Sequence, residues 1–196
     1  MKVVKAGETV NAYGYEWEVL DTDYNGGILC LMKEQICEKK FDKDECNYYP
    51  ESDICAYLAE LTEEFEAKGA SFETVNLSMR ADDGTRWDKD NYEVAGLFLL
   101  TVDLYREYRR YISNKANWWW LATAHSFSSG NSSNARLVYT DGSLGDSDAC
   151  NGDIGVAPAC IFSFLPDEDK IRQKEIAEIR EQMKALTDRL AKLEAI

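Results

Sequence analysis

The only histidine of the chain, His125, lies in a segment rich in serine and aspartate, which is the combination that hydrolytic enzymes use. A catalytic triad requires a serine nucleophile, a histidine base and a carboxylate in mutual contact, and a sequence does not supply that geometry. The chain has no Gly-x-Ser-x-Gly motif, in which a sharp turn exposes the nucleophile. Hydrolysis at His125 is therefore not favoured, and we predict that the protein is not an enzyme.

Six cysteines are spread along the chain without any Cys-x-x-Cys pair. Zinc sites draw on cysteine and histidine ligands, and one histidine leaves few to choose from. A chain of 196 residues does not need disulfide bonds, and its N-terminus lacks the apolar core and cleavage site of an export signal. We therefore predict synthesis in the cytoplasm, reduced thiols that are buried or half-buried, no metal site and no cofactor.

The segment from Leu121 to Leu165 lacks Lys, Glu, Gln, Met and Trp, although these five types make up 44 of the 196 residues. At that frequency about ten of them are expected in this segment. Randomising the two adenines of an Asn codon, AAC or AAT, reaches every amino acid except these five. The composition therefore indicates programmed variation. The alternative is ordinary loop composition, which favours Ser, Gly, Asn and Asp, although the loop-like stretch 33–51 is rich in Lys and Glu.

Residues that such randomisation leaves or produces are candidates for a ligand-binding surface, in which a few aromatic anchors stand among small polar side chains, as in an antibody paratope. The predicted contact residues are His125, Phe127, Ser128, Ser129, Asn131, Ser132, Ser133, Leu137, Tyr139, Gly145, Asp146, Ser147, Asp148, Cys150, Asn151 and Asp153. The residues expected to stay fixed and hold the strands are Trp119, Leu121, Ala135, Arg136, Val138, Leu144, Val156 and Pro158.

The strand predicted over 135–140 is central to this surface. Alternation places Arg136 and Val138 on one face and Leu137 and Tyr139 on the other, which we expect to point outward. The alternative is that Leu137 and Tyr139 pack beneath a loop. Asp141-Gly142, a hairpin signal, is expected to end the strand.

Hydrophobic periodicity predicts the elements that position this surface, beginning with a hairpin. Alternating apolar and acidic residues predict a strand over 14–20, and a continuous apolar run predicts a second over 28–32. Ser52 is a suitable N-cap for a helix in which apolar residues recur every three or four positions as far as Phe65. Gly69 is expected to end that helix.

A second helix is expected after Thr101, with strands over 72–79 and 94–100 before it, which indicates an α+β arrangement rather than repeating βαβ units. Three adjacent tryptophans at 118–120 cannot all face one side of a strand, so at least one is expected near the surface. The apolar run that ends at Leu165 predicts a final core strand.

Residues 166–196 change abruptly to Glu, Lys, Arg, Ala and aliphatic types. We predict a coiled-coil helix joining chains through 171–196. Isoleucine at both seam positions of the first heptad favours a trimer. The alternative is one amphipathic helix folded back on its own domain. The predicted seam consists of Ile176, Ile179, Met183, Leu186, Leu190 and Leu193.

The formal net charge of -14 argues against nucleic acids and anionic membranes as partners, because both are polyanions. No run of about 18 apolar residues occurs, which predicts no membrane insertion.

Three strings of this sequence resemble the C-terminal part of a large bacterial and phage domain family with the C-type lectin fold, in the branch related to formylglycine-generating enzymes. The strings are Trp119-Trp120-Leu121-Ala122-Thr123, Asn134-Ala135-Arg136-x-Val138-x-Thr140-Asp141-Gly142-Ser143-Leu144 and Gly155-Val156-Ala157-Pro158-Ala159. The stretches 15–20, 52–54 and 98–100 are similar to other landmarks of that family, so the resemblance covers residues 1–165. It implies an α+β, C-type lectin-like fold with two helices and short antiparallel sheets, followed by the coiled-coil helix.

More narrowly, residues 121–160 resemble the variable region of proteins diversified by a retroelement. In those systems an error-prone reverse transcriptase copies a template repeat and mutates its adenines. The resemblance implies a hypervariable protein on a phage tail or a bacterial surface that binds a protein or glycan of a target cell.

Two other functions stay open. An oxidoreductase of the formylglycine-generating type would need a reactive cysteine pair, for which Cys150 and Cys160 are the only candidates near the expected face. The second open function is that of a structural phage or surface protein, in which the Ser- and Asn-rich loop only faces solvent. Calcium-dependent sugar binding lacks its Glu-Pro-Asn, Gln-Pro-Asp and Trp-Asn-Asp motifs.

Overall fold

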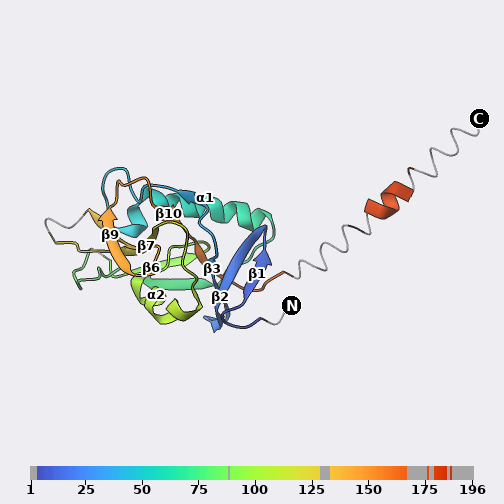
Figure 1. The fold of residues 1–196 in the computed structure, drawn as a ribbon, viewed down its shortest axis with the longest axis horizontal. Coiled ribbons are helices and arrows are strands. Elements are labelled where there is room, and N and C mark those ends of the chain that lie inside the picture. Colours follow the sequence, from blue (N-terminus) through green and yellow to red (C-terminus); the bar gives the residue numbers. More distant parts are fainter. Residues whose placement is uncertain are drawn as a thin grey trace, which may run out of the picture. The chain divides into compact units, whose positions relative to one another are not determined.

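The computed structural model describes residues 4–87, 89–128, 133–166, 176, 179–184 and 186 (Figure 1). The chain divides into two units, Val3–Leu165 and a second unit made of Met1–Lys2 and Pro166–Ile196. That division falls where the composition of the sequence changes.

The first unit is mixed α+β, with more strands than helices, as predicted. Its elements in chain order are β1 (Thr9–Ala12), β2 (Tyr15–Tyr24), β3 (Gly27–Met32), β4 (Cys37–Glu38), the 3-10 helix η1 (Tyr49–Glu51), α1 (Asp53–Ala67), β5 (Thr74–Ser78), β6 (Asn91–Ala95), α2 (Val102–Tyr108), the 3-10 helix η2 (Arg109–Tyr111), β7 (Trp119–Ala124), β8 (Asn134–Val138), β9 (Leu144–Asp148), β10 (Gly155–Val156) and β11 (Ala159–Phe162).

Three sheets organise these strands. A four-stranded sheet has the order β1-β2-β3-β11, so the last strand of the unit pairs with one of the first. A five-stranded sheet has the order β4-β10-β7-β8-β9, with β9 at its edge, and β5 pairs with β6 alone. In Figure 1, β9 lies at the opposite end of this unit from β1 and β2.

The predicted hairpin and both predicted helices are confirmed. The Ser52 side chain accepts a hydrogen bond from the backbone N–H of Cys55 and caps α1, and Gly69 follows the helix with φ at 90°. Thr101 caps α2 in the same way, through the N–H of Leu104.

One strand prediction is displaced. The strand expected over 94–100 is β6, which ends at Ala95, because its partner β5 pairs with Asn91 to Ala95. Phe98 instead forms an isolated bridge with Ala159.

The core centres on β7, whose six residues are all buried. Trp119 and Trp120 lie on opposite faces of this strand and both are buried because both faces are covered. The Trp119 ring meets Tyr105 edge-on at 5.7 Å, and the Trp120 ring meets Phe41 at 5.6 Å. Trp118 is the exposed member of the predicted trio, at 42 %.

A buried ion pair joins the segment that precedes β7 to β2. The Lys115 ammonium lies 3.5 Å from the Glu18 carboxylate and donates to the carbonyl oxygens of Met32 and Lys33 at 2.9 and 2.8 Å. The ammonium also lies 5.5 Å from the centre of the Trp119 ring. The desolvation that accompanies burial lowers the pKa of Lys115.

All six cysteines are free thiols, buried or half-buried, as predicted. In the second unit, the described residues after Pro166 are helical. Three of the predicted seam residues, Ile179, Met183 and Leu186, are exposed there. Leu190 and Leu193 lie outside the described residues, as does most of the predicted coiled coil. Within the described parts of the chain, no helix has the length and apolar character needed to span a bilayer.

Candidate ligand-binding surface

The framework residues chosen from the sequence are mostly buried beneath the candidate surface. Trp119, Leu121, Ala135, Val138, Val156 and Pro158 are buried in the five-stranded sheet or beside it. Leu144 is half-buried, and Arg136 lies on the outer side.

The faces predicted for β8 are wrong for Leu137 and Arg136, whereas Val138 is buried as expected. Leu137 is 0 % exposed and lies opposite Trp120 on one side and Gly145 on the other, so it is a core residue and not a contact residue. Gly145 is buried too, which removes it from the contact set. Arg136, expected inward, pairs with Asp146 on the outward face. The reason is that the inner face of β8 packs through Leu137 against β7, at the centre of the sheet.

The outward face of β8 and β9 carries a connected polar network. The Arg136 guanidinium lies 3.2 Å from Asp146 through Nη1 and 3.2 Å from Asp82 through Nε. Asp146 Oδ1 is 3.4 Å from Nδ1 of His125, and its other oxygen accepts a hydrogen bond from the Asn134 amide at 2.8 Å. Asp82 also pairs with Arg106 at 3.3 Å. Two of the predicted contact residues, His125 and Asp146, thus lie against each other, and Asp82 joins the network from outside the depleted segment.

The loop between β7 and β8 has fixed stems. The His125 N–H donates to the Asn134 carbonyl at 2.9 Å, and the Ala149 N–H donates to the Ser133 carbonyl at 2.8 Å. The buried Asn47 amide donates to the carbonyls of Ser126 and Asn134, both at 2.9 Å. One side chain from a distant segment therefore bridges the two stems.

Phe127 belongs to an aromatic cluster that the sequence did not predict. Its ring lies 5.5 Å from Trp87 and 6.0 Å from Tyr48, and the Trp87 and Tyr48 rings stack at 5.8 Å. Trp87 lies in the polar stretch 80–91, between the two strands predicted over 72–79 and 94–100. An isolated tryptophan in that polar stretch was the available signal.

Tyr139 occupies a different part of the surface, beside the exposed Trp118, which it meets edge-on at 4.8 Å. A Cβ atom added at Gly145 would collide with the Tyr139 ring, so the ring covers this glycine. The Asp141-Gly142 turn, which follows Tyr139, is bound to α2, because the Tyr105 hydroxyl donates to the Gly142 carbonyl at 2.6 Å.

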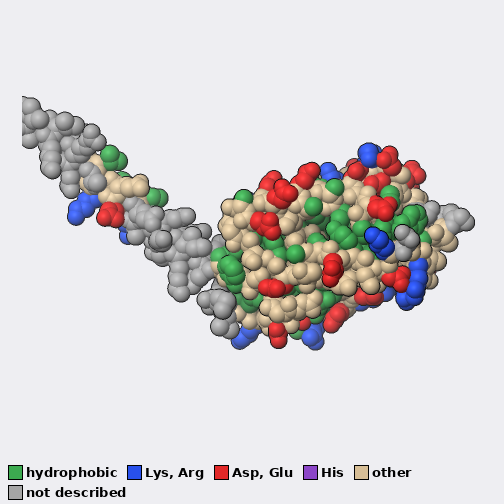
Figure 2. All heavy atoms as spheres, turned by 180° about the vertical axis from the view of Figure 1, so that it is seen from behind, with side chains coloured by type: hydrophobic (Ala, Val, Ile, Leu, Met, Phe, Trp, Pro, Cys, Tyr) green, Lys and Arg blue, Asp and Glu red, His purple; other side chains and the backbone are tan. Residues whose placement is uncertain are grey.

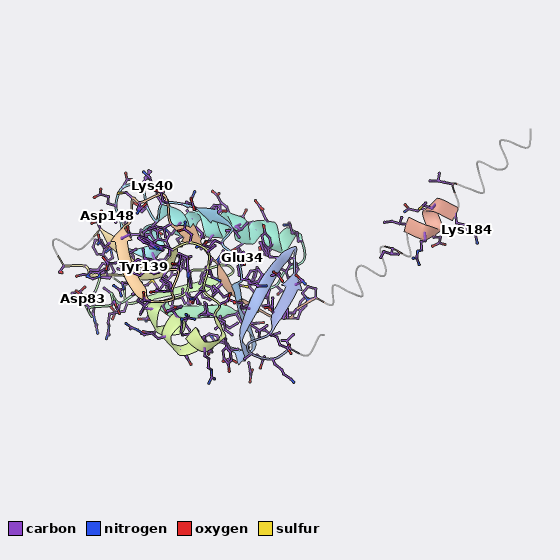
Figure 3. The ribbon with its side chains drawn as sticks, in the orientation of Figure 1. Glu34, Lys40, Asp83, Tyr139, Asp148 and Lys184 are labelled. Atoms are coloured by element: carbon purple, nitrogen blue, oxygen red, sulfur yellow. The ribbon has the colours of Figure 1, made fainter. Side chains whose placement is uncertain are left out.

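The remaining predicted contact residues differ in exposure. Ser128, Asp148 and Asp153 are exposed. Ser129, Asn131 and Ser132 lie outside the described residues. The half-buried members are His125, Phe127, Ser133, Tyr139, Asp146, Ser147, Cys150 and Asn151. Figure 3 shows Tyr139 and Asp148 at the same end of the unit.

The alternative chemistries find little support in the described residues. There, the His125 ring contacts Asp146 and Arg136, and no serine hydroxyl bonds to it. Cys160 is buried in β11 opposite Cys30, and burial raises the pKa of its thiol well above the ordinary value. Across the described ranges, no group of three or more His, Cys, Asp and Glu side chains is placed to hold a metal ion.

A family described as a domain of unknown function, DUF6273, matches residues 101–164. The match begins at the cap of α2 and ends just after β11, so it spans the depleted segment and its framework. No curated protein and no solved structure matches the chain.

Proposed function

We propose that this protein is a hypervariable ligand-binding protein with a C-type lectin-like fold, diversified by adenine-directed mutagenesis. The observation that carries the proposal is the absence of five residue types from Leu121 to Leu165, the five that adenine substitution of Asn codons does not reach. The exposed and half-buried members of the predicted contact set come from β9, from the loop between β7 and β8, and from the turns that follow β8 and β9.

The energetics of the two residue sets support this reading. The framework residues of β7 are buried on both faces, so replacing them would cost several kcal/mol each, roughly 2–5 for large apolar side chains. Exposed positions such as Ser128, Asp148 and Asp153 contribute about 0.5 kcal/mol or less. A fold arranged in this way accepts many different surfaces.

The lectin-like fold rests on the resemblance of the sequence strings. Two helices, short and mainly antiparallel sheets with one parallel pairing between β10 and β7, and a last strand paired beside the first hairpin are compatible with it. The sugar-binding function of lectins does not follow from a shared fold.

The ligand on this proposal is a protein or glycan of a target cell, and the protein is displayed as an oligomer on a phage tail or cell surface. Residues 171–196 supply a homotrimer through the predicted coiled coil. Three weak sites on one assembly add avidity at a repetitive surface without new contacts. Light scattering of the full chain and of a chain ending at Leu165 tests the trimer, and monomeric mass for both would remove it.

The diversification itself is tested by sequencing the genomic neighbourhood. We expect a near-copy of the segment that encodes residues 121–160, differing at adenines, close to a reverse transcriptase gene. We also expect independent isolates to differ at the codons of the candidate surface and not at those of Trp119, Leu121 or Val156. A neighbourhood with neither template nor reverse transcriptase would contradict the proposal.

A further inference from the structure

Trp87 presents a large aromatic surface to solvent beside the depleted segment, although it lies outside that segment. Its side chain is 44 % exposed, whereas Tyr48, on which it stacks, is only 4 % exposed. Tyr48 is therefore a fixed support beneath the exposed ring. Figure 2 shows hydrophobic side chains exposed between acidic ones on the face seen there.

The segment that carries Trp87 is fastened to the end of β7 and to the loop that follows it. The N–H groups of Asp82 and Asp83 donate to the carbonyls of Ala124 and His125, at 3.0 and 3.4 Å. The Phe127 N–H donates to the Thr85 hydroxyl at 2.8 Å. Trp87 is thus held in place before any ligand arrives, which reduces the entropy lost on binding.

The segment that carries Trp87 also carries an anionic group that suits a cationic ligand. The Asp83 carboxylate accepts hydrogen bonds from the Thr85 backbone and hydroxyl at 2.9 and 2.6 Å and has no ion-pair partner among the described residues. Hydrogen bonds from Ser126 and Thr85 lower the pKa of Asp83, so it is ionised at neutral pH. Arg86 is paired with Asp90 at 2.9 Å.

More widely, the net charge of -14 attracts basic partners. Figure 3 shows Asp83 at the same end of the unit as Asp148. Among the described residues, Asp148 also lacks an ion pair, and Lys89 is a neighbouring cation without one. An ammonium or guanidinium placed over a tryptophan face gains about 0.5–1 kcal/mol at an exposed site.

We infer that Trp87 is a constant anchor of the binding surface, which holds an Arg or Lys side chain of a protein ligand while the variable residues determine which protein is bound. Adenine substitution of Asn codons does not produce tryptophan, and Trp87 lies outside the depleted segment. The ring is therefore the same in every diversified copy, whereas its neighbour Phe127 is exchangeable. The inference rests on the proposed function, since it takes the neighbouring surface to be a ligand site.

The test measures binding of an acetylated, amidated tetra-arginine peptide to the full chain at low ionic strength, with the tetra-citrulline peptide as the neutral counterpart. We expect Trp87→Ala to weaken tetra-arginine binding about two- to fivefold, and Trp87→Phe to weaken it less. Phe164→Ala is the matched control, because Phe164 is 40 % exposed, follows β11 of the four-stranded sheet and is not one of the predicted contact residues, and the substitution leaves the net charge unchanged. Tetra-citrulline binding should not depend on Trp87.

Equal tetra-arginine affinity for the wild type and both Trp87 variants would overturn the anchor. So would a Trp87→Ala variant that loses chitotriose binding while it keeps tetra-arginine binding, because the ligand class would then be a glycan. Thermal unfolding of each variant checks the fold, and Trp87→Phe carries the comparison if the alanine variant is unstable. These outcomes are distinguishable from the genomic test: a missing template repeat would remove the proposed function and with it the constant-anchor role, and would leave only the measured contact of Trp87 with a cationic side chain.

Discussion

Strands β7 and β9 lie in one sheet, separated only by β8, yet they are built in opposite ways. All six residues of β7 are buried, whereas Gly145 is the one buried residue of the five in β9. The difference follows from position, because β7 lies between β10 and β8 and is covered on both faces, while β9 is an edge strand. The folding free energy is therefore concentrated at the centre of the sheet, and exposed side chains at its edge contribute little to it.

The largest expected effect is at the centre. Replacing Trp120 with Ala should lower the free energy of unfolding by about 3–5 kcal/mol, since the ring fills the core beside Phe41. Its indole N–H also donates to the Lys39 carbonyl at 2.9 Å. Urea denaturation measures the loss. The exposed Trp118→Ala should cost less than about 1 kcal/mol, and equal losses for both would break the comparison.

The second-largest loss of unfolding free energy is expected at Lys115, which precedes β7 in the chain. Lys115→Met should cost about 3 kcal/mol, because it leaves the Glu18 carboxylate buried without its cation. Adding Glu18→Gln to that variant should recover part of the loss, which chemical denaturation of both variants measures. No recovery in the double variant would mean that the hydrogen bonds to Met32 and Lys33, not the ion pair, carry the effect.

Asn47 joins the two ends of the loop between β7 and β8. Asn47→Ala should cost about 1–3 kcal/mol, since the Ser126 and Asn134 carbonyls each lose a buried donor. Hydrogen exchange at the His125 amide should accelerate at the same time, because that amide closes the loop stem. Asn117→Ala also removes two amide hydrogen bonds, but exposed ones, to the Glu38 carboxylate and the Asp153 carbonyl, and serves as the control. Unchanged exchange at His125 would show that the stems close without Asn47.

The edge should tolerate exchange. Ser128→Tyr, Asp148→Tyr and Asp153→Tyr should each change the free energy of unfolding by about 0.5 kcal/mol or less. Leu137→Ser, a change equally reachable by adenine substitution, should instead cost at least about 2 kcal/mol because it empties a buried site. Thermal and urea unfolding rank the four variants. Similar costs at all four positions would contradict the division into framework and surface.

The smallest expected change in stability is that of Asp83→Asn. Because hydrogen bonds lower its folded-state pKa, its ionised form stabilises the fold above the unfolded-state pKa, and this contribution disappears as pH falls through the folded-state pKa. Asp83→Asn should therefore be slightly less stable than the wild type at pH 7, and the two should converge at strongly acidic pH. Thermal unfolding across pH measures this, and a constant difference would assign the effect to packing.

Local signals in the sequence predicted local structure well. The Ser52 cap, the Gly69 stop and the Asp141-Gly142 turn are where short-range hydrogen bonding and backbone geometry put them. The candidate surface was predicted less completely. Alternation along β8 predicts two faces, but it does not indicate which face the rest of the fold covers. The prediction therefore put Leu137 on the outward face, whereas the side chain is buried.

Long-range partners explain the other omissions. Asn47, Asp82 and Trp87 contact residues 125–136 from segments far away in the chain, and nothing adjacent to them in sequence marks that meeting. Arg136 shows the same limit, because its outward position depends on Asp82. Pairings of this kind require the topology to be known.

The placement of the Tyr139 ring over Gly145 links a residue that follows β8 to a residue of β9. A bulky residue at 139 leaves room only for glycine at 145, and a side chain at 145 requires a small residue at 139 or a displaced ring. Under the proposed diversification, isolates should therefore show these two sites changing in concert. The repertoire would then be smaller than the product of the choices available at each codon.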